Sequence, residues 1–500
     1  MKNAFTSLAL LFLLVLPGFA QDTEIFLKRV DAEFNTIDVT HDSEGNSYIL
    51  GASQGQAAVK RYNSAGILDK TVALTGAANP VAMTVGGNFL YVAGNKQIVR
   101  LDLENLLQEA TTFQISQVNL PDMFFRDVVY VPQRGEIVAV AQNPGSRWPR
   151  IIRRNANLTA TSAPEVTAVE SAGVRGSAGD GSWVRAATVD DVGNVYVVGE
   201  VSGSPSGDLA GGANKGYIFK FKMNNTVVLN KRIEYLDIDN VLFNNGWLYV
   251  GGGVNATGSE NSYAVSRFAT TDASLSAAAD SEFYIRNTDY VNLNLDNDDR
   301  SFKFNLAADA SDNLYITGYA TNGITSFNSG GEEYTRFSST AEEAYVAKLN
   351  TDFEYQWVKS PIQSPFPSFG SHFRISWDAV NSRLWWAGSY SGNVNLSMQE
   401  GSQQVTLKSL VGDSVTQGFA ASFEPDGSFT EVVDFTLLTD YGEDRVNLNG
   451  SAFGSTGQTF EVIVDSDLNI QTPRDIYQFN QANGTFLETD NIEGNQNIID

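Results

Sequence analysis

A short unit recurs along this chain and limits the folds that it can adopt. "ASDNLYITG" at 310–318 closely resembles "SEGNSYILG" at 43–51 and "DVGNVYVVG" at 191–199. Each copy has a polar turn, then an aromatic residue between aliphatic or β-branched residues, and then a glycine. Alternating polar and apolar positions after a turn signal are typical of half-buried strands. The unit therefore predicts many short strands rather than helices.

The chain holds eight copies of a larger repeat built around this unit. A strand precedes the unit, a third strand follows it, and a variable fourth strand completes the repeat. The eight versions of the unit read "GNSYILG", "NFLYVAG", "GEIVAVA", "GNVYVVG", "GWLYVGG", "DNLYITG", "SRLWWAG" and "RVNLNG". One such sheet cannot bury both of its faces, whereas sheets arranged radially cover one another. We predict an all-β fold, a β-propeller of seven or eight four-stranded antiparallel blades.

Several of these strings resemble a known repeat family. "DASDNLYITGYA" (309–320) and "EEAYVAKLNTDFEYQWVKS" (342–360) resemble the bacterial seven-bladed β-propeller repeat (SBBP-type) family, as do "DDVGNVYVVGEVSGS" and "GYIFKFKMNN". The family pattern reads roughly D-x-x-G-N-x-Y-V-T-G, then D-A-F-V-A-K-L. The resemblance extends over most of 30–470, although the second, third and eighth copies lack the G-N-x-Y core. It implies a propeller in an exported or cell-surface protein and leaves the ligand open.

The two ends of the chain differ from the repeats. Residues 1–20 have an early Lys2, an apolar run, and small residues at Gly18 and Ala20, as in a secretory signal peptide cleaved after Ala20. We therefore expect a secreted or cell-surface protein, with the propeller at 21–472. "EIFLKRV" (24–30) has the pattern of a fourth strand that closes the ring by joining the last blade. Residues 473–500 form a polar tail with one candidate strand, "DIYQFN".

Composition narrows the classes of partner and cofactor. The formal net charge of −25 repels phosphate groups, so we expect no nucleic-acid partner. The apolar run near the N-terminus is too short to span a bilayer comfortably, so we expect no membrane insertion. The chain has no cysteine and only two histidines, which excludes thiolate and multi-histidine metal sites. We expect a monomer without a cofactor.

Calcium is the one metal that the sequence leaves open. "LDNDDR" (295–300) and "DSDLN" (465–469) have closely spaced oxygen ligands, but neither has the glycine and distal glutamate of an EF-hand loop. A solvated acidic turn is the favoured explanation of both strings, so calcium is only weakly supported and we assign no metal ligand.

The residues that lead into the predicted first strands suggest a binding site. First strands line the central channel of a propeller, and their leading ends share a face with the long loops at 200–215, 319–343 and 389–417. The last two loops also contain patterns for small extra hairpins. The candidate ligand-binding residues are Asp122, Arg126, Trp183, Arg185, Asp237, Asp239, Asp298, Asp299, Arg300, His372 and Arg374. Alternating carboxylates and guanidinium groups suit a sugar or a charged peptide, although strand ends that meet solvent are polar in any case.

The sequence thus favours a binding or adhesion module for an extracellular glycan or protein ligand. The alternative is a polysaccharide-degrading lyase or glycosidase that uses funnel carboxylates and His372. No G-x-S-x-G, P-loop or H-E-x-x-H motif occurs, so we assign no catalytic residue. Trp377, Trp385 and Trp386 could serve as sugar platforms, but the last two fall in a second strand, which favours burial in the core.

Overall fold

The computed structural model describes most of the chain between residues 24 and 487. The longer gaps in this description are 143–148, 169–181, 202–214, 271–280, 288–303, 360–367, 408–415, 435–444, 448–462 and 466–473. Within the described residues the fold is built from β-strands, and the only helical segment is the 3-10 helix η1 (Ile115–Val118). No helix there is long and apolar enough to cross a membrane.

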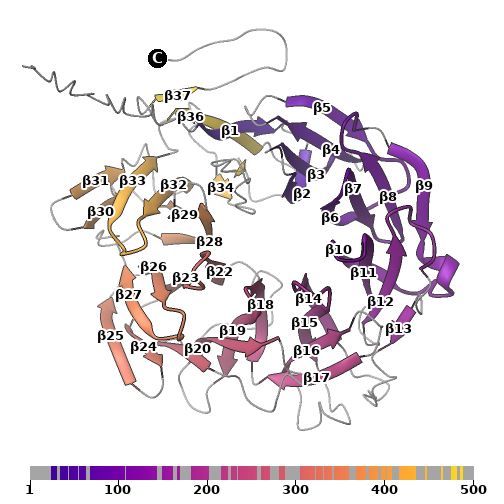
Figure 1. Cartoon of the computed structure of the whole chain (residues 1–500). Helices are drawn as coiled ribbons and strands as arrows, with labels where there is room; N and C mark the ends of the chain where they lie inside the picture. Colours follow the sequence, from indigo (N-terminus) through magenta and orange to yellow (C-terminus); the bar gives the residue numbers. More distant parts are fainter. Residues whose placement is uncertain are drawn as a thin grey trace, which may run out of the picture.

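Antiparallel sheets follow one another along the chain and stand around a central opening, as the blades of a β-propeller do (Figure 1). The first four sheets each contain four strands in chain order. They are β2 to β5 (Phe34–His41, Ser47–Ser53, Gln56–Tyr62, Leu68–Ala73), β6 to β9 (Pro80–Gly86, Phe89–Gly94, Gln97–Asp102, Gln108–Gln114), β10 to β13 (Phe124–Val131, Glu136–Gln142, Arg150–Asn155, Val166–Ala168) and β14 to β17 (Ser182–Val189, Val195–Val201, Lys215–Phe221, Val227–Ile233).

The next three sheets repeat this order with additions. The fifth has β18 to β21 (Tyr235–Asn244, Trp247–Asn255, Asn261–Ala269, Ser281–Asn287), the sixth has β22, β23, β26 and β27 (Phe304–Ala308, Leu314–Ala320, Glu343–Leu349, Tyr355–Lys359), and the seventh has β28, β29, β32 and β33 (Ser368–Asp378, Arg383–Ser391, Thr416–Phe423, Phe429–Asp434). The first strands β2, β6, β10, β14, β18, β22 and β28 contact one another in this order, so they form the inner wall.

The two predicted extra hairpins are confirmed. Strands β24 (Gly323–Ser329) and β25 (Glu332–Ser339) arise from the loop between β23 and β26 and extend the fifth sheet, because β24 pairs with β21. Strands β30 (Leu396–Glu400) and β31 (Gln403–Leu407) form a separate two-stranded sheet. The sixth sheet thus sends a hairpin onto its neighbour, which ties the two sheets together.

The closing sheet joins the two ends of the chain. It contains β34 (Arg445–Asn447), β35 (Ile463–Asp465), β36 (Arg474–Asn480) and β1 (Glu24–Val30), with β37 (Thr485–Leu487) beside β36. The sequence assigned "RVNLNG" and "FEVIV" to the second and third strands of the last repeat and set a boundary at residue 472. In the part of the chain that the structure describes, these two segments overlap β34 and β35, β36 lies next in the sheet, and β1 takes the outer place. The first strand predicted for this repeat, "FTLLTD" (435–440), lies outside the described residues.

The apolar core consists of layers between neighbouring sheets. Strand β7 shows why: Leu90 and Val92 pack toward the first sheet, whereas Tyr91 and Ala93 pack toward the third. Successive side chains of a strand point to opposite faces, so a strand buried on both faces is apolar at almost every position. The second-strand tyrosines Tyr48, Tyr91, Tyr196, Tyr249 and Tyr315 are all buried, as the predicted wedge between blades requires.

The turn before three of these tyrosines is held by one aspartate. Asp190 accepts the N–H groups of Val192 and Asn194, the side-chain amide of Asn194 and the hydroxyl of Tyr196, at 2.7 to 3.1 Å. Asp42 and Asp309 make the same four contacts in their own turns. The repeated D-x-x-x-N-x-Y spacing is therefore a hydrogen-bonded turn that also anchors the buried tyrosine.

A basic residue near the end of each of the first six third strands links its sheet to the next. Lys220, for example, donates to the carbonyl of Thr270 at 2.6 Å, and Arg153 donates to the carbonyl of Lys222 at 3.2 Å. The other links run from Arg61 to Leu103, Arg100 to Ala156, Arg267 to Thr351 and Lys348 to Pro425. The lysine or arginine of the repeat thus satisfies a turn carbonyl of its neighbour, which fixes the spacing of the sheets.

Candidate functional site

Most of the inner strands carry a β-bulge at the same level of the ring. Five consecutive first strands each leave one residue at this level without a partner on the second strand, and these residues are Ile37, Val81, Arg126, Arg185 and Asp239. Strand β18 has a second irregularity nearer its start, at Leu236. The residue after each bulge pairs with Leu50, Ala93, Val140, Val198 or Gly251, which occupy the same place in the repeated unit. A bulge redirects a side chain and is common beside binding sites.

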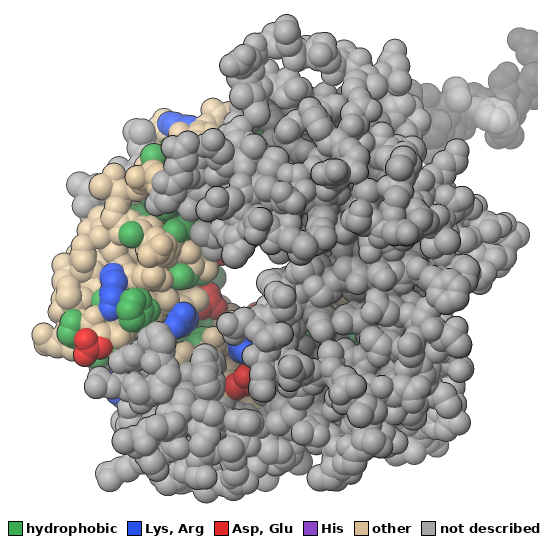
Figure 2. All heavy atoms as spheres, turned by 180° about the vertical axis from the view of Figure 1, so that it is seen from behind, with side chains coloured by type: hydrophobic (Ala, Val, Ile, Leu, Met, Phe, Trp, Pro, Cys, Tyr) green, Lys and Arg blue, Asp and Glu red, His purple; other side chains and the backbone are tan. Residues whose placement is uncertain are grey.

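Three of the candidate residues predicted from sequence occupy these bulges. Arg126, Arg185 and Asp239 belong to the adjacent inner strands β10, β14 and β18. Both basic and acidic side chains of the described residues lie beside the central opening, seen from the other side of the ring in Figure 2. The structure therefore places three of the predicted residues at one level of the opening; Asp239 is placed by its strand register alone.

The two arginines differ in their contacts. Arg126 is exposed, and no hydrogen bond or ion pair joins it to any residue that the structure describes. Arg185 donates its Nε–H to Oε1 of Glu200 at 2.8 Å, with 29% of the Arg185 side chain and 13% of the Glu200 side chain exposed. Glu200 belongs to β15 and was not among the predicted residues. The site thus offers two guanidinium donors and one carboxylate acceptor.

Side chains of the third sheet hold the Arg185 bulge on both sides. Oε1 of Gln142 accepts the N–H of Val184 at 3.0 Å, and Oδ2 of Asp127 accepts the N–H of Ala187 at 2.8 Å. Burial deep in the ring raises the pKa of Asp127 to about 6, and its two backbone N–H contacts only partly oppose this. Asp38 and Asn305 accept the N–H groups of Met83 and Ile375 in the same way, at 2.7 and 3.1 Å.

Among the other predicted residues that the structure describes, only Arg374 shares this level, without a bulge, because its partner Ala387 has the same place in the repeated unit as Val140 and Val198. Asp122 is exposed in the turn before β10. Trp183 and Asp237 lie nearer the start of β14 and β18, opposite Glu200 and Gly253. His372 lies in the irregular stretch of β28 between Phe369 and Phe373, and Arg374 pairs with Ala387. Asp298, Asp299 and Arg300 lie outside the described residues.

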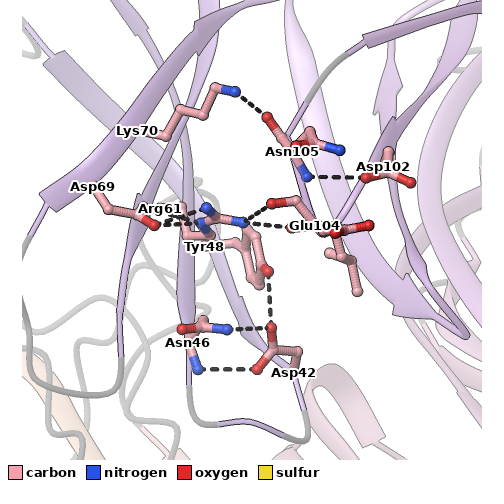
Figure 3. Close-up of polar contacts among 10 residues, drawn as sticks. Asp42, Asn46, Tyr48, Arg61, Asp69, Lys70, Asp102, Glu104 and Asn105 are labelled. Carbon is pink, nitrogen blue, oxygen red and sulfur yellow. Dashed lines mark hydrogen bonds and ion pairs between the residues drawn. The ribbon is translucent and has the colours of Figure 1, made fainter.

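A separate cleft opens between the first and second sheets, near the ends of the strands away from the bulges. It has a volume of about 960 Å³. Figure 3 shows its polar contacts: Arg61 bridges the cleft, paired with Asp69 at 2.7 Å and donating to the carbonyls of Leu103 and Glu104. Of its other acids, Asp42 holds its turn and Asp102 accepts the N–H of Asn105 at 2.9 Å. These contacts give Asp42, Asp69 and Asp102 structural roles.

The structure describes some of the residues that the sequence analysis considered as calcium ligands or as sugar-binding tryptophans. No group of three acidic or histidine side chains in the described ranges could hold a metal ion. Both candidate calcium strings fall outside those ranges, apart from Asp465 at the end of β35. Trp385 and Trp386 are buried, and Trp377 stacks on Tyr315 with ring centroids 5.5 Å apart. Core packing, as the sequence favoured, is confirmed for Trp385 and Trp386.

Three residues of the site escaped the sequence analysis, namely Asp127, Gln142 and Glu200. A signal for Asp127 does exist, because Asp38, Asp127 and Asn305 are polar residues at the same place in their first strands, each followed by an aliphatic residue. No comparable signal marks Gln142 or Glu200, since polar residues are common near the end of a second strand.

No protein-family model matches the chain, and no curated protein matches it. Among solved structures it is similar to virginiamycin B lyase from Staphylococcus aureus, with 12% identity, a TM-score of 0.40, and coverage of 73% of this chain and 94% of that one. It is also similar to polysaccharide lyase Uly1, with 9% identity, a TM-score of 0.32, and coverage of 82% and 98%. A quinonprotein alcohol dehydrogenase-like protein from Bacteroides thetaiotaomicron shares 13% identity at a TM-score of 0.32, with 65% of each chain covered. Likeness this distant carries no inference about the activity of this chain.

Proposed function

We propose that this protein is an exported eight-bladed β-propeller that binds an acidic glycan at its central opening. The observation that carries the proposal is the placement of Arg126 and Arg185 on equivalent bulges of adjacent inner strands. A guanidinium group presents a planar set of donors that matches a carboxylate. Two such groups at one level can hold the carboxylates or hydroxyls of a sugar chain.

Glu200 favours a glycan over an acidic peptide. Its carboxylate lies 2.8 Å from Arg185 and can accept hydrogen bonds from sugar hydroxyls, which both donate and accept. A sugar chain presents hydroxyl donors on every ring, whereas the acidic side chains of a peptide carry no donor for this carboxylate when they are ionised. The formal net charge of −25 opposes any anion at long range, but salt screens that repulsion beyond about 8 Å at physiological ionic strength.

The count of eight blades and the export are part of the proposal. Seven sheets follow the repeat in chain order, and the closing sheet adds an eighth through β1 and β36. The signal-peptide pattern of residues 1–20 supports export. An exported propeller with charged groups at its opening suits a role in adhesion or in the capture of extracellular glycan.

Isothermal titration calorimetry with a uronic-acid oligosaccharide and with a neutral oligosaccharide of equal length tests the binding. We expect the acidic probe to bind more tightly, and Arg126→Ala or Arg185→Ala to weaken it by about 1–3 kcal/mol, the cost of a lost charge-assisted hydrogen bond. The matched control is Arg134→Ala, which removes an arginine from the same sheet at the turn between β10 and β11, where it pairs with Glu136.

Three results would contradict the proposal. These are binding of neither sugar by the parent protein, binding of an acidic peptide in place of the sugar, and binding by both arginine variants that equals that of the parent. Cleavage of the acidic probe, lost in His372→Ala, would instead establish the alternative of a polysaccharide-degrading enzyme.

A further inference from the structure

We infer that Asp127 is the positioning residue of the central site, because its carboxylate sets the two arginine bulges relative to one another. The inference rests on the proposed function insofar as it concerns binding. Asp127 directly follows Arg126 in β10, and the residue whose N–H it binds, Ala187, lies two positions after Arg185 in β14. One side chain thus spans the boundary between the two strands at the level of both arginines.

The hydrogen bond between Asp127 and Ala187 restrains a stretch of backbone that strand pairing within the sheet does not fix. A bulge interrupts the ladder between the first and second strands, so the extra residue is not fixed by a cross-strand partner. For the Arg185 bulge, Gln142 and Asp127 supply the missing restraint by binding Val184 and Ala187, on either side of it. Gln142 is itself buried, so the third sheet provides a rigid frame for an arginine of the fourth.

The first and second sheets provide a natural control. Asp38 makes the equivalent contact with the N–H of Met83 at 2.7 Å, but the bulges beside it carry Ile37 and Val81. If the contact only stabilises the ring, loss of Asp38 and loss of Asp127 have the same consequences. If it positions the binding groups, only the loss of Asp127 affects the ligand.

Asparagine can replace the aspartate in this role. Oδ1 of Asn305 accepts the N–H of Ile375 at 3.1 Å in the same position of the sixth sheet. An Asp127→Asn variant therefore keeps an acceptor for Ala187, whereas Asp127→Ala loses it. Rescue by asparagine separates a positioning hydrogen bond from a need for negative charge.

A spin-label measurement tests the geometry without any ligand. The chain has no native cysteine, so cysteines introduced by Arg126→Cys and Arg185→Cys take nitroxide labels at these two sites alone. We expect pulsed electron paramagnetic resonance to give a narrow distance distribution with Asp127 present, a broader one with Asp127→Ala, and no change with Asp38→Ala. Equal distributions for all three backgrounds would overturn the inference.

Calorimetry with the uronic-acid oligosaccharide supplies the second readout. We expect Asp127→Ala to weaken binding about tenfold, while Asp127→Asn and Asp38→Ala bind as the parent does. Equal losses of affinity in Asp127→Ala and Asp38→Ala would show that the contact only stabilises the ring, and would overturn the inference. Failure of the parent to bind would refute the proposed function alone, because the spin-label distances still decide whether Asp127 positions the two bulges.

Discussion

The boundary between the first and second sheets and the boundary between the third and fourth share one construction but carry different side chains. In both, an aspartate of one first strand accepts a backbone N–H of the next, at 2.7 and 2.8 Å. The bulge residues are aliphatic at the earlier boundary and Arg126 and Arg185 at the later one. The repeat therefore provides a common frame, and one residue in each blade decides whether that part of the opening carries a charge.

The outer contacts of the two boundaries differ as well. The earlier boundary opens into the cleft of about 960 Å³, and partly exposed Arg61 bridges it. At the later boundary fully buried Arg153 reaches the carbonyl of Lys222 and lies 3.5 Å from Glu136. Burial lowers the pKa of Arg153, and Glu136 opposes that shift. Equivalent links are thus partly exposed to solvent in one place and buried in the other, so we expect equal substitutions to have unequal costs.

The largest contrast should appear at the turn aspartates. Asp190 is buried, and Asp190→Ala leaves the Tyr196 hydroxyl and the Asn194 amide without their acceptor. We expect a loss of about 2–4 kcal/mol in the free energy of unfolding. Asp42 is only half-buried, so Asp42→Ala should cost about 1–2 kcal/mol because water can replace part of what is lost. Urea unfolding measures both.

Asp191→Ala is the control for this comparison, since Asp191 is exposed in the same turn and should change stability by no more than about 0.5 kcal/mol. Equal losses at Asp190 and Asp42 would show that burial of the turn does not set its contribution.

A smaller effect concerns pH. The pKa of Asp127 is raised to about 6 in the folded protein from an ordinary value of 3.8, so the folded state holds a proton that the unfolded state has released. Stability from this group is therefore present at low pH and is lost as pH rises through 6. Between pH 5 and 7 we expect the parent to lose about 1 kcal/mol relative to Asp127→Asn, which does not titrate. Urea unfolding at several pH values measures this. Equal changes in the free energy of unfolding of the two proteins between pH 5 and 7 would contradict the assignment.

The smallest effects should come from the two partly exposed ion pairs. Asp69→Asn breaks the pair with Arg61, and Glu200→Gln breaks the pair with Arg185. Each should cost about 1 kcal/mol or less in stability. Only Glu200→Gln should change the affinity for the acidic oligosaccharide, because only that pair lies beside the arginine bulges. A binding change in Asp69→Asn would move the site to the cleft.

Much of this architecture could be predicted from the sequence, because its causes are local. The period-2 pattern and the turn residues located the strands, including the hairpins β24–β25 and β30–β31. The contacts of Asp127 and Gln142 could not be predicted, since their acceptor atoms bind backbone 60 and 42 residues away. The predicted boundary at residue 472 left β36 outside the propeller, although β36 pairs with β1 in the closing sheet. Of the predicted site residues, Arg126, Arg185 and Asp239 lie on equivalent bulges because the register of their strands follows the repeat.

The pairing of β1 with β36 has a consequence for how the molecule is made. Each blade can form from neighbouring strands, so most contacts arise quickly and in the order of synthesis. The closing sheet cannot form until both ends of the chain are present, and joining them requires closure of a loop that contains the whole ring. The entropic cost of closing a loop rises by only about 0.6 kcal/mol for each doubling of its length. The blades that have already assembled lower this cost further, because they hold the two ends of the chain near each other. We expect ring closure to be the last and slowest folding step, with the edges of the first and last sheets unprotected until then.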